Sequence, residues 1–243
     1  MYDALQTSHM ASSLTTSMTT LKNASLDKPL DTSIDLAFTV HVVYEDDTLL
    51  VLHKPAGLLA VPGRGEDKQD CVSLRVQQQY PDALVVHRLD QATSGLMLMA
   101  RGPAMQRTLG QLFETRLVDK TYTAVVHGWL ANDVGQIDLP IAADWPARPL
   151  RKIDHALGKP ALTHYQIVAR NSDDTTRVLL RPHTGRTHQL RVHMLALGHA
   201  IVGDMLYGHG VPEGSRLHLH ASQLCLVHPV TGQPMDWRSE ASF

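Results

Sequence analysis

The segment HRLDQATSG at residues 87–95 constrains the fold more than any other part of this chain. It places the carboxylate of Asp90 in a short loop of small residues, between an extended run that ends at Val86 and an apolar run over 96–100. A carboxylate held between two buried strands loses hydration, and this cost must be offset by a partner. Taken alone, the segment also fits a structural strand-loop-strand in which an ion pair holds Asp90.

The rest of the chain predicts one α+β domain. The 243 residues are enough to bury a sizeable core. Residues 1–35 are rich in Ser and Thr without periodicity, which predicts a flexible leader before a domain over 36–243. Helices are expected over 71–80, 103–113 and 187–197, and strands over 40–43, 49–53, 121–128, 163–170 and 177–181. Many short strands with few helices predict a mostly antiparallel sheet with flanking helices and a central cleft.

Cysteine usage and hydropathy favour the cytoplasm. Cys71 and Cys225 are far apart and form no CxxC pair, which suits a reducing compartment. No apolar run reaches the roughly 18–20 residues of a membrane span. The chain also begins without a basic region followed by an apolar stretch, so no secretory signal is expected.

Charge is unevenly distributed along a chain whose net charge is −2. Residues 1–87 carry six Lys and Arg against eleven Asp and Glu, whereas residues 145–191 carry nine against three. A basic segment on a near-neutral protein is what a local phosphate-binding face would look like. A solvated charged surface gives the same pattern, so charge alone does not decide between the two.

Two further segments carry candidate chemistry. Residues 120–128 (KTYTAVVHG) alternate as a strand, and this places Tyr122 on the same inward face as Ala124 and Val126. A strand tyrosine with an apolar body is by itself most often a core residue. Residues 184–193 (TGRTHQLRVH) place Arg186 just before the start of a predicted helix.

These three segments, in this order, resemble the motifs of the RluA family of pseudouridine synthases. The resemblance implies a pseudouridine-synthase catalytic domain in which Asp90 is the nucleophile, Tyr122 packs against the target base and Arg186 pairs with Asp90. A guanidinium beside the carboxylate would offset its desolvation. The opening block KPAG at residues 54–57 and the late block RLHLHA at residues 216–221 also resemble the family, and the latter implies that Leu219 contributes to the base pocket.

A narrower resemblance concerns the substrate. Residues 144–149 (DWPARP) and 158–163 (GKPALT) are similar to the RluA-type subgroup, which acts on tRNA anticodon stem-loops and a similar 23S rRNA hairpin loop. The leader fits no family motif, and the chain has no room for the extra RNA-binding domain of larger relatives. The catalytic domain is therefore expected to recognise structured RNA alone, as a monomer without an obligate protein partner. RNA contacts are expected from Arg88, Thr93, Arg148, Lys159, His188 and Arg191, with Arg88 filling the space that the target base vacates.

The resemblance implies uridine-to-pseudouridine isomerisation without a cofactor. The N1–C1′ bond breaks, uracil turns within the site, and C5 bonds to C1′. Asp90 would either attack C1′ or remove the C2′ proton, and the sequence leaves both routes open. Tyr122 is the expected participant in removal of the C5 proton.

Two alternatives come from other functional classes. One is a catalytically inactive RNA-binding protein of the same fold, which the presence of Asp90, Tyr122 and Arg186 argues against. The other is a metal-dependent hydrolase, which the fifteen histidines invite. His188 and His193 lie five residues apart, about 140° around a helix, and no third ligand is signalled near His218 and His220. Structural histidines and no metal are therefore expected.

Overall fold

A computed structural model describes residues 40–243, which belong to one compact unit. The leader predicted over residues 1–35 lies outside the described residues. The fold of the described part is built on one mixed sheet, and the predicted α+β class is confirmed.

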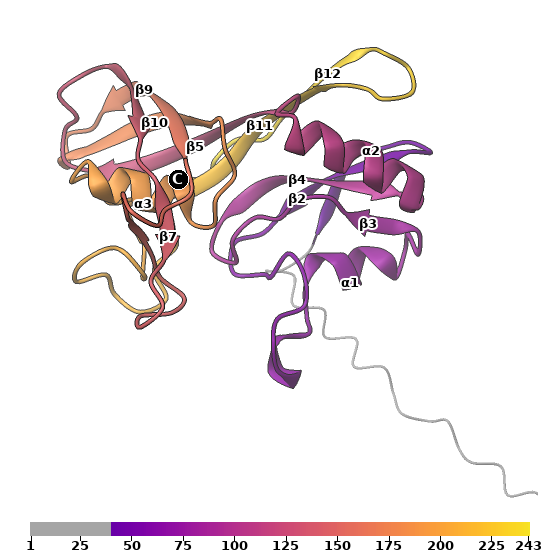
Figure 1. Cartoon of the computed structure of the whole chain (residues 1–243), viewed down its shortest axis with the longest axis horizontal. Coiled ribbons are helices and arrows are strands. Elements are labelled where there is room, and N and C mark those ends of the chain that lie inside the picture. The colour runs from indigo at the N-terminus through magenta and orange to yellow at the C-terminus, as the bar shows by residue number, and fades with distance from the viewer. Residues whose placement is uncertain (1–39) are drawn as a thin grey trace, which may run out of the picture. The chain divides into compact units, whose positions relative to one another are not determined.

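The main sheet has ten strands, in the order β1-β2-β4-β11-β5-β10-β9-β6, with β12 on β11 and β3 on β4 (Figure 1). Its pairs are antiparallel except for β4 and β11, which run parallel. A separate two-stranded hairpin is formed by β7 and β8. The strands are β1 His41–Glu45, β2 Leu49–Lys54, β3 Ala83–Val85, β4 Ser94–Arg101, β5 Asp119–His127, β6 Val134–Asp138, β7 Ile141–Ala143, β8 Arg151–Ile153, β9 Leu162–Arg170, β10 Thr175–Pro182, β11 Leu219–Val227 and β12 Pro234–Arg238.

Three α-helices are found in residues 40–243: α1 Val72–Gln77, α2 Gly102–Glu114 and α3 Gln189–Ala196. A short 3-10 turn, η2, covers Glu66–Lys68. α1 and α2 lie beside the half of the sheet that contains β2, β3 and β4, and α3 lies beside the other half (Figure 1). α2 begins as expected around Pro103, because a proline in the first turn loses no helical hydrogen bond.

Helix α3 begins at Gln189, one residue later than the expected cap at Thr187 predicts. Its N-cap is His188, held in the left-handed region at φ 57°, and no side chain caps the helix. The helix ends at Ala196, close to the predicted end, and Gly198 follows at φ 84°. Arg186 therefore precedes the helix, and Arg191 lies in its first turn.

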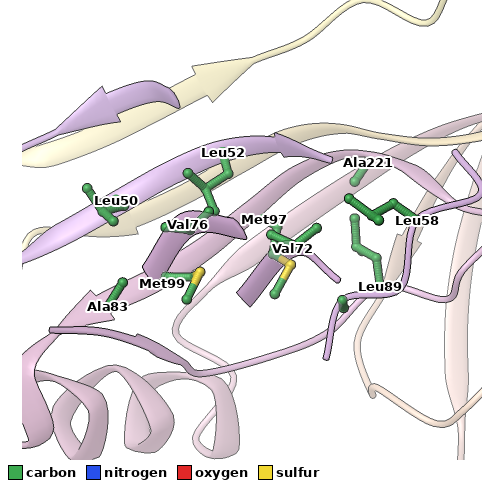
Figure 2. Packing of buried hydrophobic residues seen from close by; sticks show 11 residues of the cluster. Leu50, Leu52, Leu58, Val72, Val76, Ala83, Leu89, Met97, Met99 and Ala221 are labelled. Carbon is green, nitrogen blue, oxygen red and sulfur yellow. The ribbon is translucent and has the colours of Figure 1, made fainter. Parts of the chain in front are cut away.

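Strand β4 is buried on both faces, which explains its continuous apolar sequence. Met97 and Met99 pack on one side with Val72 and Val76 of α1 (Figure 2). Leu96, Leu98 and Ala100 pack on the opposite side, in a cluster that includes Leu109 of α2. The strand that follows the Asp90 loop is therefore held rigidly from both sides.

Gly95 lets β4 come against β11. It adopts φ +112°, and a β-carbon there would stand 2.3 Å from the carbonyl oxygen of Ala221. Only glycine fits such an approach. Ala221 pairs with Gly95 on one side and with Tyr122 of β5 on the other. The register of three strands therefore brings the Asp90 loop close to Tyr122.

Candidate active site

Asp90 lies where two cavities meet. A cavity of about 490 Å³ is lined by Asp90 together with Tyr122 and Leu219, and also by the loop before α3. A second, of about 790 Å³, is lined by Asp90 and, among others, by residues 56, 57, 59–63, 203, 205 and 206. Arg88 lines both cavities and is exposed, so its side chain can reach a ligand in either one.

The Asp90 loop is fastened to the KPAG block. The amide of Thr93 donates to the Asp90 carbonyl at 3.0 Å, which closes the turn. The carbonyl of Gln91 accepts from the amide of Gly57 at 2.8 Å and from Nζ of Lys54 at 3.0 Å. Lys54 is fully buried and also donates to the carbonyls of Pro55 and Leu58. Burial lowers the pKa of Lys54 to about 7, against the opposing charge of Asp90.

His87 is held as a neutral ring at the other end of this loop. Its Nε2 accepts a hydrogen bond from the amide of Leu98 at 2.9 Å, so the ring proton is on Nδ1. The ring stacks on Phe113 with centroids 4.4 Å apart. Burial, helped by the charge of Lys120, lowers the pKa of His87 to about 3. His87 therefore positions the loop and is unsuited to carry charge at neutral pH.

The cation nearest to Asp90 is Arg191. Its Nη1 stands 3.7 Å from Oδ2 of Asp90. The same guanidinium donates to both oxygens of Asp204, from Nε at 2.8 Å and from Nη2 at 2.6 Å. Burial lowers the pKa of Arg191, but the hydrogen bond and charge of Asp204, with the charge of Asp90, outweigh it and raise the pKa overall. Asp204 thus orients the guanidinium that faces Asp90.

The expected pair between Arg186 and Asp90 is not formed, and this is a correction. Nε of Arg186 donates instead to the carbonyl of Pro160 at 3.0 Å, and its amide donates to Oε1 of Gln189 at 2.9 Å. Because α3 begins only at Gln189, Arg186 remains in the loop at the cavity wall, whereas Arg191 lies inside the helix and points inward.

A second correction concerns Arg191, which was expected to contact RNA. It is only 3% exposed, and its donors are directed at Asp204 and Asp90. A buried guanidinium with these two partners is placed to hold Asp204 and to face Asp90, and it is poorly placed to contact a phosphate.

Tyr122 forms a wall of the cavity. It pairs with Ala221 of β11 and Leu180 of β10, and it packs against the apolar clusters on both sides of this junction. Burial, with a smaller contribution from the charge of Asp90, raises the pKa of Tyr122. The hydroxyl is therefore protonated at neutral pH. Leu219 is 3% exposed and lines the same cavity, as expected.

His188 lies against Asp90 and not at the outer surface. Its Nε2 stands 4.0 Å from Oδ1 of Asp90, and its Nδ1 lies 2.8 Å from the hydroxyl of Tyr207. That hydroxyl accepts from the amide of Arg151, and it can donate to Nδ1, which leaves the Nε2 proton facing Asp90. Burial lowers the pKa of His188, although the charge of Asp90 opposes this. Its expected role in RNA binding is thus confined to the immediate surroundings of Asp90.

The other residues expected to contact RNA lie in different settings. Thr93 is 2% exposed and lies in the cavity wall. Arg148 and Lys159 are exposed, on or next to the β7–β8 hairpin. The structure therefore does not gather the six expected RNA contacts on one surface.

Sequence reasoning missed Asp204 and Tyr207. Asp204 is fully buried and also accepts from the amides of Leu206 and Tyr207. The available signal was a lone acid: Asp204 is the only Asp or Glu in residues 192–212, a largely apolar stretch. A single buried carboxylate beside a basic helix predicts an ion pair.

Several histidines have structural partners. His193 is fully buried, with Nδ1 2.9 Å from Oγ1 of Thr163 and Nε2 3.0 Å from the carbonyl of Leu139. His220 lies between the hydroxyls of Ser94 and Ser239. Among residues 40–243, no group of three or more His, Cys, Asp or Glu is arranged to hold a metal ion. In the same part of the chain, no helix is long and apolar enough to cross a membrane.

Comparison with known proteins gives consistent matches. Residues 48–196 match the family model described as RNA pseudouridylate synthase. A relative from Yersinia pestis, named dual-specificity RNA pseudouridine synthase RluA, is 52% identical over 206 residues, which cover 83% of this chain and 99% of the relative. A protein of the same name from Haemophilus influenzae is 43% identical, covering 83% and 93%. Among solved structures, human RNA pseudouridylate synthase domain containing 1 is similar with a TM-score of 0.70 and 28% identity, covering 85% of each chain.

Proposed function

The chain belongs to the RluA family of pseudouridine synthases, and from that premise we propose that it isomerises a uridine in the anticodon stem-loop of tRNA and in a hairpin loop of 23S rRNA. The observation that carries the proposal is the position of Asp90, in a cavity wall beside Tyr122 and within 3.7 Å of a buried arginine. The curated relatives named dual-specificity enzymes support the use of two RNAs. The segments over 144–149 and 158–163 support the same subgroup.

Asp90 is proposed as the residue that acts on the ribose. Nη1 of Arg191 and Nε2 of His188 stand 3.7 Å and 4.0 Å from its two oxygens, so a nitrogen faces each oxygen of the carboxylate. Either attack on C1′ or removal of the C2′ proton releases uracil, which then turns and bonds through C5. Arg191 stabilises negative charge on Asp90 before and after this step, because Asp204 keeps its guanidinium in place.

Tyr122 is proposed to take part in the last proton transfer. A free phenolate is disfavoured, because burial and the charge of Asp90 raise the pKa of Tyr122. A relay avoids this difficulty: the hydroxyl passes its proton to the regenerated Asp90 carboxylate as it accepts the proton from C5. Asp90 then gives up that proton as N1 of the turned uracil takes one, which completes pseudouridine and returns Asp90 and Tyr122 to their starting states. The ring also forms, with Leu219, an apolar wall against the face of the base.

RNA recognition is proposed to use loop shape and phosphate contacts. Arg88 is exposed and lines both cavities, which suits a side chain that fills the gap left by the target base. The exposed cations Arg148 and Lys159, with Arg186, are the remaining candidates for phosphate contacts. The enzyme is also proposed to act as a monomer, in the cytoplasm where its RNA substrates are found.

Tritium release from [5-³H]uridine-labelled RNA tests the function. The wild-type protein should release tritium from a tRNA anticodon stem-loop and from the 23S hairpin, whereas Asp90→Ala should release none. Asp133→Ala, which removes a carboxylate that is 76% exposed, is the matched control and should behave as wild type.

Each negative outcome excludes one part of the proposal. Absence of release from every tRNA or rRNA loop, with RNA binding intact, would favour an inactive RNA-binding protein. Release that persists in Asp90→Ala would exclude Asp90 as the reacting residue. Release from only one RNA would exclude dual specificity.

A further inference from the structure

A third cavity, separate from those that Asp90 lines, lies beside the β7–β8 hairpin. Its volume is about 540 Å³, and Trp145, Arg151 and Lys159 are among its lining residues. Arg186 lines both this cavity and the one that contains Tyr122, and Thr187 lines both this cavity and the larger one. The third cavity therefore neighbours the two that Asp90 lines.

Trp145 presents an aromatic surface at this cavity. Its side chain is 67% exposed, which leaves a large apolar ring in contact with solvent. The guanidinium of Arg148 lies over the ring, 3.6 Å from its centroid. A cation stacked on one face holds the indole in place, and it leaves the remaining surface open to a planar ligand.

A second exposed tryptophan provides a contrast. Trp129 is 59% exposed, but its indole nitrogen donates to the carbonyl of Asn171, and it lines none of the three cavities described above. The indole nitrogen of Trp145 has no hydrogen-bond partner within residues 40–243. Exposure alone does not distinguish the two residues, whereas the cavity and the stacked arginine do.

The walls of the third cavity are cationic. Arg151, Lys152, Lys159 and Arg186 line it, and Asp154 is the single acid among the lining residues. Nε of Arg151 is buried without a hydrogen-bond partner in the described part of the chain. Nζ of Lys152 lies 3.8 Å from the carboxylate of Asp154, whereas Arg151, Lys159 and Arg186 form no ion pair within residues 40–243. Several unpaired cations suit an anionic oxygen.

We propose that this cavity is a second nucleotide subsite, in which Trp145 stacks on an unpaired base of the RNA and the neighbouring cations hold its phosphate. The inference rests on the proposed function, because the nucleotide belongs to the same RNA loop as the target uridine. An aromatic surface with a basic wall is the combination that binds single-stranded nucleotides, and stacking tolerates any base. The subsite thus recognises an unstacked nucleotide outside the stem and does not read its identity.

Coupling between a protein change and an RNA change tests this subsite directly. Affinity for an anticodon stem-loop is measured in the Asp90→Ala background, so that no turnover occurs, with and without Trp145→Ala. Each loop nucleotide other than the target is replaced in turn by an abasic residue. Removing the base from one position should weaken binding about tenfold when Trp145 is present, and Trp145→Ala should abolish that sensitivity.

Two further variants serve as controls. Trp145→Phe keeps an aromatic ring and should retain most of the sensitivity to the abasic residue. Trp129→Ala should bind every RNA as the parent protein does. All variants are compared at one salt concentration, because phosphate contacts make affinity depend on salt.

The subsite would be overturned if the loss of affinity from Trp145→Ala simply added to the loss from the abasic residue at every loop position. It would also be overturned if Trp129→Ala removed the sensitivity to the abasic residue as strongly as Trp145→Ala does. Failure of the parent protein to bind the stem-loop would overturn it as well. The proposed function is scored separately, by tritium release from the intact stem-loop with wild-type protein. A protein that releases tritium but shows no coupling is a pseudouridine synthase without this subsite.

Discussion

The catalytic floor and the basic rim of this protein differ in how their charged groups are held. The catalytic floor consists of Asp90, Tyr122, Arg191 and Leu219, and the basic rim consists of Trp145, Arg148, Arg151, Lys159 and Arg186. In the floor, Arg191 is 3% exposed and is fixed by two hydrogen bonds to Asp204. In the rim, Arg148 and Lys159 are exposed.

The difference indicates that one small domain can hold its reacting groups rigidly in the floor while the residues of the rim adjust to the RNA. Strand register and a buried ion pair set the positions of the reacting groups, as shown by the pairing of Ala221 with both Gly95 and Tyr122. The rim lies on a two-stranded hairpin and a loop, which can adjust to RNA. We expect changes in the floor to alter the rate of chemistry, and changes in the rim to alter affinity.

After the loss of Asp90 itself, the largest effect is expected when the floor loses the hydroxyl of Tyr122. Tyr122→Phe removes the proposed proton relay and keeps the apolar wall. Tritium release should fall by about 10²–10⁴-fold, the usual contribution of a general acid–base group, while the affinity for RNA stays the same. The checking measurement is single-turnover tritium release with enzyme in excess. A loss smaller than threefold would assign Tyr122 to the wall of the pocket alone.

The next effect compares two Arg–Asp pairs. Asp204→Asn leaves Arg191 buried beside a neutral partner, and breaking a buried pair costs about 3–5 kcal/mol. The free energy of unfolding in urea should fall by that amount, and the single-turnover rate should fall with it. Asp133→Asn breaks the exposed pair with Arg170 and should cost less than about 1 kcal/mol. Equal losses in the two variants would contradict the distinction between floor and surface.

A third effect is expected from pH, and it originates at His87, next to the catalytic floor. His87 has a pKa of about 3 in the folded protein and about 6.5 in the unfolded chain. Between these values the unfolded chain binds the proton and the folded protein does not, so the free energy of unfolding should decrease as the pH falls from about 6.5 toward 3. Urea unfolding at several pH values checks this. His87→Gln, which can still accept from the amide of Leu98, should lessen the decrease, and an unchanged pH profile would contradict the assignment.

Local patterns predicted most of the fold. The alternation over 121–128 and 163–170 corresponds to β5 and β9, and Pro103 marks the start of α2. The helix expected over 71–80 is shorter, ending at Gln77. The backbone turns after it, with the amide of Tyr80 bonded to the carbonyl of Val76 before Pro81. The pairing of β4 with β11 joins segments more than one hundred residues apart, and no local pattern carries that information.

Most residues of the candidate site were named from the sequence, but the arginine that faces Asp90 was not. Asp90, Tyr122 and Leu219 line one cavity, yet the cation beside Asp90 is Arg191 and not Arg186. The choice between two arginines five residues apart depends on contacts with segments distant in sequence: Arg186 donates to the carbonyl of Pro160, and Arg191 pairs with Asp204. No local pattern in residues 184–193 carries either contact. Asp204 was missed although it is a lone acid in an apolar stretch, because its pairing with Arg191 is a tertiary contact.

One comparison tests the central claim, that Arg191 is the counter-ion of Asp90 and Arg186 belongs to the basic rim. The first-order rate of tritium release is measured at saturating enzyme for Arg191→Lys and for Arg186→Lys, which both keep a positive charge. The account predicts a fall of about tenfold or more for Arg191→Lys, because a lysine cannot hold Asp204 with two bonds while facing Asp90, and a nearly unchanged rate for Arg186→Lys. A slowed Arg186→Lys beside a fully active Arg191→Lys would contradict it.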